Sequence, residues 1–237
     1  MTARPVFDTC QYIKKAKNSF CPRWLLAFSP WKYWERNHWA GQDAGEIHGY
    51  DRYCSYDDRL PVLIAELERL ISKEDLILDL GCNCGFNLNE VKKAGFTAVS
   101  GLDISRTAIE YGKQTFGLTG DELLTGSFEE RLPEMLQKNR KFTLVYSMGA
   151  TLELVHPSFD IIKAICDITD RYVLLVISEW GHRYPRFWEY EFNRQGFLLV
   201  KCLRPFNGGL PDKEPLAMIS LLLFQRLENP DRRFPVG

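Results

Sequence analysis

The sequence predicts an α/β protein with a doubly wound, mostly parallel sheet of seven strands and an antiparallel last strand. An aromatic-rich, helical N-terminal cap is expected to precede the sheet. Two observations favour this class: short apolar runs alternate with helical segments, and a glycine-bearing loop directly follows the first of these runs. The chain has 237 residues, 45% of them hydrophobic, so it can bury one sizeable core.

The strands and helices are expected to alternate regularly. Strands are predicted at 76–80, 98–102, 123–124, 142–147 and 172–177, and helices at 86–94, 106–116 and about 158–168. Gly95 stands where a C-cap glycine would end the first of these helices, and Ser105 is placed to cap the start of the second. Such alternation is typical of a parallel sheet that is covered on both faces and binds ligands at the carboxyl ends of its strands.

The last part of the chain has a different pattern. Two further strands, at Phe197–Leu203 and Met218–Arg226, are separated by the Pro- and Gly-rich stretch Arg204–Pro215. This arrangement favours an antiparallel hairpin with a long loop. The hairpin would supply the antiparallel last strand of the predicted sheet.

The loop after the first strand carries the strongest local signal. The apolar run ends at Asp79, and Gly81 and Gly85 follow it, four residues apart from each other. Glycines at such a turn let the chain bend sharply and let a ligand touch the backbone. A second apolar stretch ends at Asp103, where a carboxylate can accept hydrogen bonds from two ribose hydroxyls. This spacing indicates a nucleotide-binding site.

The residues of this loop distinguish between the possible classes of nucleotide ligand. A dinucleotide site needs G-x-G-x-x-G, and the three positions hold Gly81, Asn83 and Phe86. Asn83 tolerates a positive φ angle, so the bend survives, but Phe86 would block the close packing of the helix. A P-loop is excluded because no Gly-Lys-Ser/Thr follows. An adenosine ligand without a pyrophosphate remains, and S-adenosylmethionine fits that description.

Residues from about 32 to 226 resemble the class I S-adenosylmethionine-dependent methyltransferases. The first motif of that family, D-x-G-x-G-x-G, resembles Asp79–Gly85, with departures at Asn83 and Cys84. Three further motifs follow in the family's order: the second-strand motif at Val99–Ser105, the adenine-ring segment at Gly126–Phe128 and the fourth-strand motif at Phe142–Gly149. Thr143 replaces an Asp that is common in the last of these.

The resemblance implies a Rossmann-like fold and a transferase that uses S-adenosylmethionine. The expected organisation is a cap or lid over residues 1–70, a cofactor-binding domain over 71–228 and a tail over 229–237. The side chains and loop positions that would bind the cofactor are Asp79, Gly81, Asn83, Gly85, Asp103, Ile104, Ser127, Phe128 and Ser147.

The first 60 residues are rich in aromatic side chains and hold four of the six tryptophans. The plainest interpretation is that these rings pack a helical extension onto the sheet. As a group they could also attract the sulfonium cation of the cofactor, and Trp34 and Tyr56 are the candidates. The Gly-bearing block Trp39–Tyr56 could move as a lid. Asp43, Glu46 and His48 in this block could instead face a polar substrate.

The chemistry needs alignment of the acceptor and, for an amine or hydroxyl acceptor, a base. Many relatives carry Leu-Glu-His after the fourth strand, whereas this chain has Leu-Glu-Leu at 152–154 and a histidine two positions on. The candidate bases are Glu153, His156, Glu179 and His182. A helix-start cap and a surface loop are the alternative explanations for Glu153 and His156. Arg183 or Arg186 could bind a substrate carboxylate, or be exposed loop charges.

Composition and charge limit the classes of molecule that this protein is expected to bind. The formal net charge is −1, which gives no sign of binding to nucleic acid or to an anionic membrane. The longest apolar runs are too short to span a bilayer, and no signal peptide is apparent. Seven cysteines without a C-x-x-C pair favour reduced thiols in the cytoplasm. Cys82 and Cys84 are interpreted as small loop residues, so no metal is expected.

Three functions are compatible with these residues. The first is methylation of a small molecule, in the biosynthesis of a specialised metabolite. The second is a cyclase that consumes S-adenosylmethionine and releases methylthioadenosine, as the similar azetidine-2-carboxylate synthases do. The third is a non-catalytic cofactor-binding protein. The sequence leaves the acceptor and the oligomeric state open.

Overall fold

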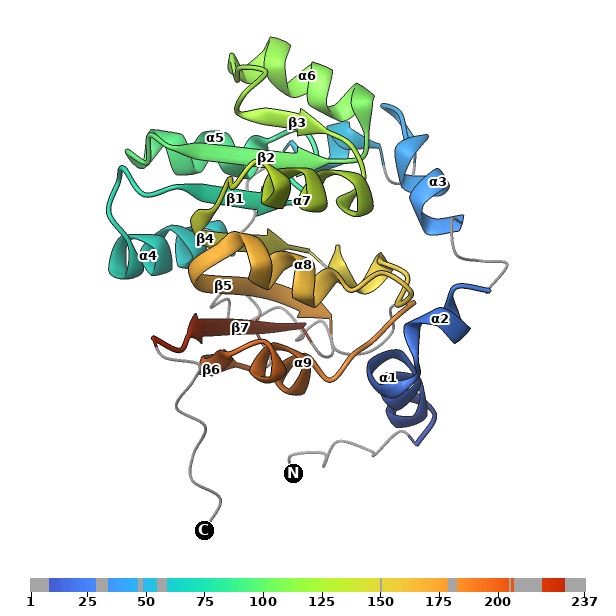
Figure 1. The fold of residues 1–237 in the computed structure, drawn as a ribbon. Coiled ribbons are helices and arrows are strands. Elements are labelled where there is room, and N and C mark those ends of the chain that lie inside the picture. The colour runs from blue at the N-terminus through green and yellow to red at the C-terminus, as the bar shows by residue number, and fades with distance from the viewer. Residues whose placement is uncertain are drawn as a thin grey trace, which may run out of the picture.

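The computed structural model describes residues 9–28, 34–46, 49–54, 59–149, 151–178, 183–204, 206 and 219–228. Over these residues the chain forms one seven-stranded sheet with helices on both faces (Figure 1). The strands are β1 (Ile77–Leu80), β2 (Val99–Asp103), β3 (Leu123–Thr125), β4 (Phe142–Met148), β5 (Thr169–Ser178), β6 (Phe197–Leu203) and β7 (Ile219–Arg226).

The strand order is β3-β2-β1-β4-β5-β7-β6. The first five strands are parallel to one another, whereas β7 runs antiparallel to both β5 and β6. The predicted fold class is therefore confirmed. The hairpin of the last two strands is confirmed as well, and β7 lies inside the sheet while β6 forms its edge.

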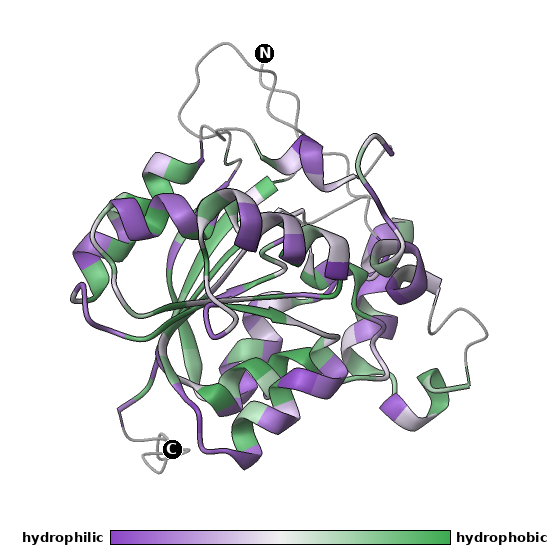
Figure 2. Cartoon of the chain, turned by 90° about the horizontal axis from the view of Figure 1, so that it is seen from above, coloured by the Kyte–Doolittle hydropathy of each residue, from purple (hydrophilic) through white to green (hydrophobic). Residues whose placement is uncertain are grey.

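Among the described residues, three helices cover each face of the sheet. One face packs against α4 (Leu60–Leu70), α5 (Phe86–Lys93) and α6 (Arg106–Phe116), and the other against α7 (Phe128–Gln137), α8 (Ile161–Ile168) and α9 (Trp188–Arg194). Successive residues of a strand point to opposite faces, so Ile77 joins the first apolar cluster and Leu78 the second. Figure 2 shows these apolar strands running between the helices.

Most element bounds agree with the sequence pattern, and the differences have local causes. Helix α6 has the predicted bounds, and the Ser105 hydroxyl caps it by accepting the Ala108 N–H at 3.2 Å. Strand β5 begins at Thr169, whereas the sequence pattern predicts a start at residue 172. The prediction begins too late because the first residues of the strand are polar and fall outside the apolar run. Helices α7 and α9 were not predicted: α7 contains Pro133 and α9 has only seven residues.

Helix α4 lies within the first 70 residues yet packs into the main core. Its side chains Leu60, Leu63 and Leu67 are at most 1% exposed and belong to the same apolar cluster as Ile77 of β1. The packing of the sheet domain therefore begins near residue 60. The other N-terminal elements are α1 (Thr9–Phe20), α2 (Arg23–Leu26), α3 (Trp34–Ala40) and the 3₁₀ turn η1 (Tyr50–Tyr53).

These N-terminal elements lie along the carboxyl edge of the parallel strands (Figure 1). Their partners lie in the loop or the first helical turn that follows each of β1 to β5: Cys54 contacts Cys84, Gln42 contacts Thr107, Arg36 contacts Glu130, Arg23 contacts Pro157, and Trp34 contacts Arg183. Its described residues thus make a contact after each of the five parallel strands, at the edge where the fold class binds ligands. That its aromatic rings form a lid remains a prediction.

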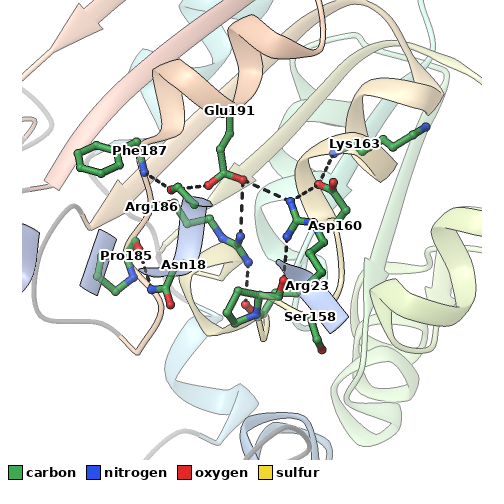
Figure 3. A network of polar contacts seen from close by, with 12 residues as sticks. Asn18, Arg23, Ser158, Asp160, Lys163, Pro185, Arg186, Phe187 and Glu191 are labelled. Atoms are coloured by element: carbon green, nitrogen blue, oxygen red, sulfur yellow. Dashed lines mark hydrogen bonds and ion pairs between the residues drawn. The ribbon is translucent and has the colours of Figure 1, made fainter. Parts of the chain in front are cut away.

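A polar network anchors α1 and α2 to the rest of the fold (Figure 3). The Arg23 guanidinium donates to the Pro157 carbonyl at 2.7 Å and pairs with Asp160 at 2.8 Å. The Ser19 hydroxyl donates to Glu191 at 2.7 Å, and the Asn18 amide donates to the carbonyl of Pro185 at 2.8 Å. Charge-assisted bonds of this kind fix the orientation of the first two helices on the loop before α8 and on α9.

None of the helices in the described part of the chain is both long and apolar enough to cross a bilayer.

Candidate functional site

The glycine loop between β1 and α5 is built on three left-handed residues. Gly81, Asn83 and Gly85 have φ angles of +78°, +50° and +75°. The predicted positive φ of Asn83 is thereby confirmed. The Gly81 amide donates to the Leu102 carbonyl at 2.8 Å, which joins the start of the loop to the end of β2. The loop bends sharply at the carboxyl end of β1, as a nucleotide site requires.

Asp103 ends β2 and holds the glycine loop in place. Its carboxylate accepts the Asn83 N–H at 2.8 Å and the Ser105 N–H at 2.8 Å. Burial raises the pKa of the Asp103 carboxyl, and the hydrogen bonds from neighbouring amides partly offset the rise. The side chain is still partly exposed, so further hydrogen bonds from a ligand are possible.

Asp79 is the most deeply buried acid of the predicted cofactor site. It is 2% exposed and lies in β1 between Gly101 of β2 and Tyr146 of β4. Burial raises the pKa of Asp79 to about 8; the Tyr146 hydroxyl opposes this shift and the negative charge of Asp103 adds to it. A cation close to Asp79 would relieve both unfavourable effects.

The remaining predicted cofactor residues lie along the same edge of the sheet. The Ser147 hydroxyl is buried and donates to the Leu80 carbonyl at 2.8 Å, so it ties β4 to β1. Ser127 is the N-cap of α7 and is 3% exposed. Phe128 packs partly buried against the second apolar cluster, and Ile104 is partly exposed beside Asp103. Their contacts with a cofactor remain a prediction.

Trp34, the candidate for the sulfonium, is 44% exposed at the start of α3. Its ring stacks on His38 with centroids 5.2 Å apart, and the Arg183 guanidinium lies 4.8 Å from its centroid. The structure therefore brings Trp34 and Arg183 together from distant parts of the chain. Tyr56, the second aromatic candidate, lies outside the described residues, as does His48.

Glu153 follows β4 in the 3₁₀ turn η2 (Leu152–Leu154) and is fully buried. Its carboxylate accepts the Ser178 N–H at the end of β5, and its backbone carbonyl accepts the Tyr184 N–H at 2.9 Å. The side chain thus connects the ends of two neighbouring strands. A base in this position would need the loops around it to open before it could reach an acceptor.

His156 is 6% exposed, and its ring lies against Tyr184 with centroids 5.1 Å apart. Ring atom Nδ1 accepts the Ser158 N–H at 3.2 Å and lies 2.9 Å from the Ser158 hydroxyl. An amide can only donate, so the neutral ring carries its proton on Nε2. In this tautomer Nε2 is a donor, which does not suit a general base.

Of the other candidate bases, Glu179 and His182 lie outside the described residues. Arg183 is exposed, as the loop-charge interpretation expected. That interpretation is wrong for Arg186, which is fully buried and belongs to the anchoring network of α1 and α2 (Figure 3). Its guanidinium lies 3.7 Å from Glu191 and donates to the Val155 carbonyl at 3.1 Å.

No group of three or more metal-binding side chains occurs among the described residues. Cys82 and Cys84 are buried in the glycine loop.

Two residues that sequence reasoning missed shape the loop. A Cβ added at Gly112 of α6 would lie 2.0 Å from the Cys84 carbonyl oxygen, so this glycine lets α6 approach the loop backbone. Glycine inside a helical pattern is the signal that could have revealed it. Thr151 stands against Gly81: a Cβ at Gly81 would meet its methyl carbon at 2.4 Å. A side chain at Gly81 would therefore meet Thr151 first.

Gly81→Ala is therefore expected to damage both the fold and cofactor binding. The φ of +78° alone costs an alanine about 1–2 kcal/mol, and the contact with Thr151 adds to this cost. Gly117→Ala is the matched control, since Gly117 has a φ of +66° and open space around its Cβ position. Thermal unfolding and calorimetric titration of both variants with S-adenosylmethionine test this. Equal losses in the two variants would contradict the role of Thr151.

These residues fit S-adenosylmethionine. The carboxylate of Asp103 stands at the end of β2 for ribose hydroxyls, the left-handed loop brings backbone close to a ligand, and buried Asp79 suits a cationic one. When bound, this cofactor supplies an activated methyl group on a sulfonium.

Comparisons with known proteins give a match for part of the chain. Residues 77–170 match the family model described as a methyltransferase domain. No curated protein sequence matches the chain significantly.

Solved structures of methyltransferases have the same fold at low identity. Magnesium protoporphyrin IX methyltransferase from Synechocystis PCC 6803 with bound SAM is 14% identical, with a TM-score of 0.56 over 94% of this chain and 100% of that one. A TehB-like SAM-dependent methyltransferase from Corynebacterium glutamicum is 16% identical, with a TM-score of 0.53 over 73% of this chain and 89% of that one. The methyltransferase-domain match covers residues 77–170, and the sheet topology and the solved structures show that the chain has the class I, Rossmann-like fold of S-adenosylmethionine-dependent methyltransferases.

Proposed function

We propose that this protein transfers the methyl group of S-adenosylmethionine to a small molecule in the cytoplasm, in the biosynthesis of a specialised metabolite. The observation that carries the proposal is the course of the N-terminal segment. It contacts the loop or the first helical turn after each of the five parallel strands, and so covers the edge at which this fold binds its ligands. An enclosed site suits a small acceptor better than a polymer.

Two further observations support a small acceptor. The formal net charge of −1 offers no attraction for nucleic acid. One solved structure, which aligns over its whole length, is named for magnesium protoporphyrin IX, a small molecule. This similarity supports only the small size of the acceptor.

In this function the chain's own residues bind the cofactor and align the acceptor with its methyl group. Asp103 would accept hydrogen bonds from the ribose, and Asp79 would face the positive charge of the cofactor. Trp34 and Tyr56 would supply aromatic faces for the sulfonium, and the N-terminal segment would exclude water. Arg183, stacked on Trp34, would meet an anionic group of the acceptor.

The second candidate function is cyclisation of S-adenosylmethionine itself with release of methylthioadenosine. The state of the two candidate bases after β4 favours it, because Glu153 is fully buried and the Nδ1 contacts of His156 make Nε2 a donor. A reaction within one molecule needs no acceptor site beside the cofactor.

Mass spectrometry of the protein incubated with S-adenosylmethionine alone separates the two. We expect the cofactor to remain intact until an acceptor is added, and then to yield S-adenosylhomocysteine during a screen of small amines, acids and phenols. The Asp103→Ala variant serves as the control for background hydrolysis. Growth of methylthioadenosine together with a cyclic amino acid would overturn methyl transfer in favour of cyclisation.

A further inference from the structure

Two cysteines from distant parts of the chain meet beside the glycine loop. The sulfur atoms of Cys54 and Cys84 are 2.8 Å apart, although 30 residues separate them in sequence. A disulfide bond is about 2.05 Å long, so the thiols are within about 0.8 Å of bonding distance. All seven cysteines of the chain are free thiols in the structure.

The two thiols differ in their burial and in the segment that holds them. Cys84 is fully buried in the glycine loop, its amide donates to the Asn83 side chain at 2.8 Å, and its carbonyl oxygen lies against Gly112. Cys54 follows η1, is partly exposed, and donates to the Tyr50 carbonyl at 3.2 Å. The buried sulfur is therefore held by the rigid loop, and the accessible one belongs to the N-terminal segment.

We propose that Cys54 and Cys84 form a reversible disulfide that fastens the N-terminal segment onto the cofactor loop and slows exchange of the cofactor. The effect on exchange rests on the proposed cofactor site, whereas formation of the bond does not. Disulfides in cytoplasmic proteins are mostly transient and sense redox state, so a reversible bond agrees with the proposed location.

The reaction is a two-electron oxidation by hydrogen peroxide. The Cys54 sulfur attacks a peroxide oxygen, the O–O bond breaks, and Cys54 becomes a sulfenic acid with release of one water. The Cys84 sulfur then attacks the Cys54 sulfur, the S–O bond breaks, and a second water carries away the proton of Cys84. Two thiols and one peroxide thus give one disulfide and two waters.

The order of these steps follows from the surroundings of the two thiols. Burial raises the pKa of the Cys84 thiol, and the hydrogen bond to Cys54 raises it further, so Cys84 is a poor first nucleophile. Cys54 is the thiol that a solvent-borne oxidant can reach. Cys84 resolves the sulfenic acid because its sulfur already touches that of Cys54.

The bond would restrain the part of the N-terminal segment that adjoins the site. The ring of Tyr50 in η1 packs on Tyr111 of α6 at 4.9 Å, and α6 in turn abuts the Cys84 backbone at Gly112. A bond between residues 54 and 84 would hold this packing in place for as long as the two cysteines stay oxidised. A cofactor that must pass between the segment and the glycine loop would then enter and leave slowly.

The first test maps thiols on the intact protein without cofactor. After titration with hydrogen peroxide, we expect a peptide pair joined through Cys54 and Cys84, two of the seven thiols lost, and recovery with dithiothreitol. Cys202→Ser, which removes an exposed cysteine of β6, should behave like the wild type, and Cys54→Ser should give no joined pair. Oxidation of Cys10 or Cys202 while Cys54 and Cys84 stay reduced would overturn the proposal.

The second test measures release of labelled S-adenosylmethionine from reduced and oxidised protein. We expect release to slow at least about tenfold on oxidation, to recover with dithiothreitol, and to be insensitive to oxidation in Cys54→Ser. Unchanged release from protein that carries the mapped disulfide would overturn the effect on exchange. Neither measurement requires methyl transfer, so failure of the proposed function would not imitate failure of the switch.

Discussion

Replacing Asp103 with alanine is expected to weaken binding of S-adenosylmethionine by about 1.5–3 kcal/mol, or roughly 10- to 150-fold in Kd. The variant has no carboxylate to accept hydrogen bonds from the ribose. The amides of Asn83 and Ser105, which donate to this carboxylate at 2.8 Å in the wild type, would also lose their acceptor, so the glycine loop would lose its anchor at the end of β2. Isothermal titration calorimetry measures the loss directly.

The control for this variant is Asp121→Ala, which removes the same charge from an exposed turn. It should bind the cofactor like the wild type. Thermal unfolding of both variants shows whether the Asp103 variant retains its fold. Affinity that is unchanged in a folded Asp103→Ala protein would place the cofactor elsewhere.

Replacing Asp79 with asparagine is expected to change stability and binding in opposite directions. The pKa of Asp79 is about 8 in the folded protein, against 3.8 as the ordinary value. Between these values the folded state holds a proton that the unfolded state has lost, so the stability of the ligand-free protein falls as pH rises from about 4 to about 8. One such proton is worth at most about 1.4 kcal/mol per pH unit, or roughly 3–5 °C in Tm.

Asp79→Asn removes this dependence, because an amide is neutral at every pH. The melting temperature of the variant should therefore exceed that of the wild type at pH 8, with the two converging below about pH 4, where Asp79 is neutral in both the folded and the unfolded state. Binding should suffer, since no carboxylate remains to face the cationic cofactor. In the wild type at pH 7, binding should release a proton, which titrations in buffers of different ionisation enthalpy detect. A variant that melts with the same pH slope as the wild type would contradict the raised pKa.

Local sequence patterns predicted the parts of the fold that depend on local chemistry. Helix α6 could be placed by its capping serine, and the bend at Asn83 by a residue type that tolerates positive φ. The first residues of β5 were missed because a strand whose first side chains are polar gives no apolar run. Helix α7 was missed because Pro133 interrupts its pattern.

The part of the site made by distant residues could not be predicted in this way. Cys54 meets Cys84 across 30 residues, and Arg36 meets Glu130 across 94, without any spacing rule to announce either pair. An arginine in a loop is usually exposed, yet Arg186 is fully buried beside Val155 and Glu191, which lie far from it in the sequence or on another element. Such contacts depend on how whole elements pack, and composition within a short window does not contain that information.

The position of β7 in the sheet affects how the chain folds while it is being synthesised. β6 leaves the ribosome before β7, yet β7 lies between β5 and β6 and pairs with both. Until residues 219–226 emerge, β5 has an unpaired edge along the apolar run Val173–Ile177, and β6 has no strand to join. A nascent chain that stalls in this interval would expose a surface prone to aggregation and to chaperone capture.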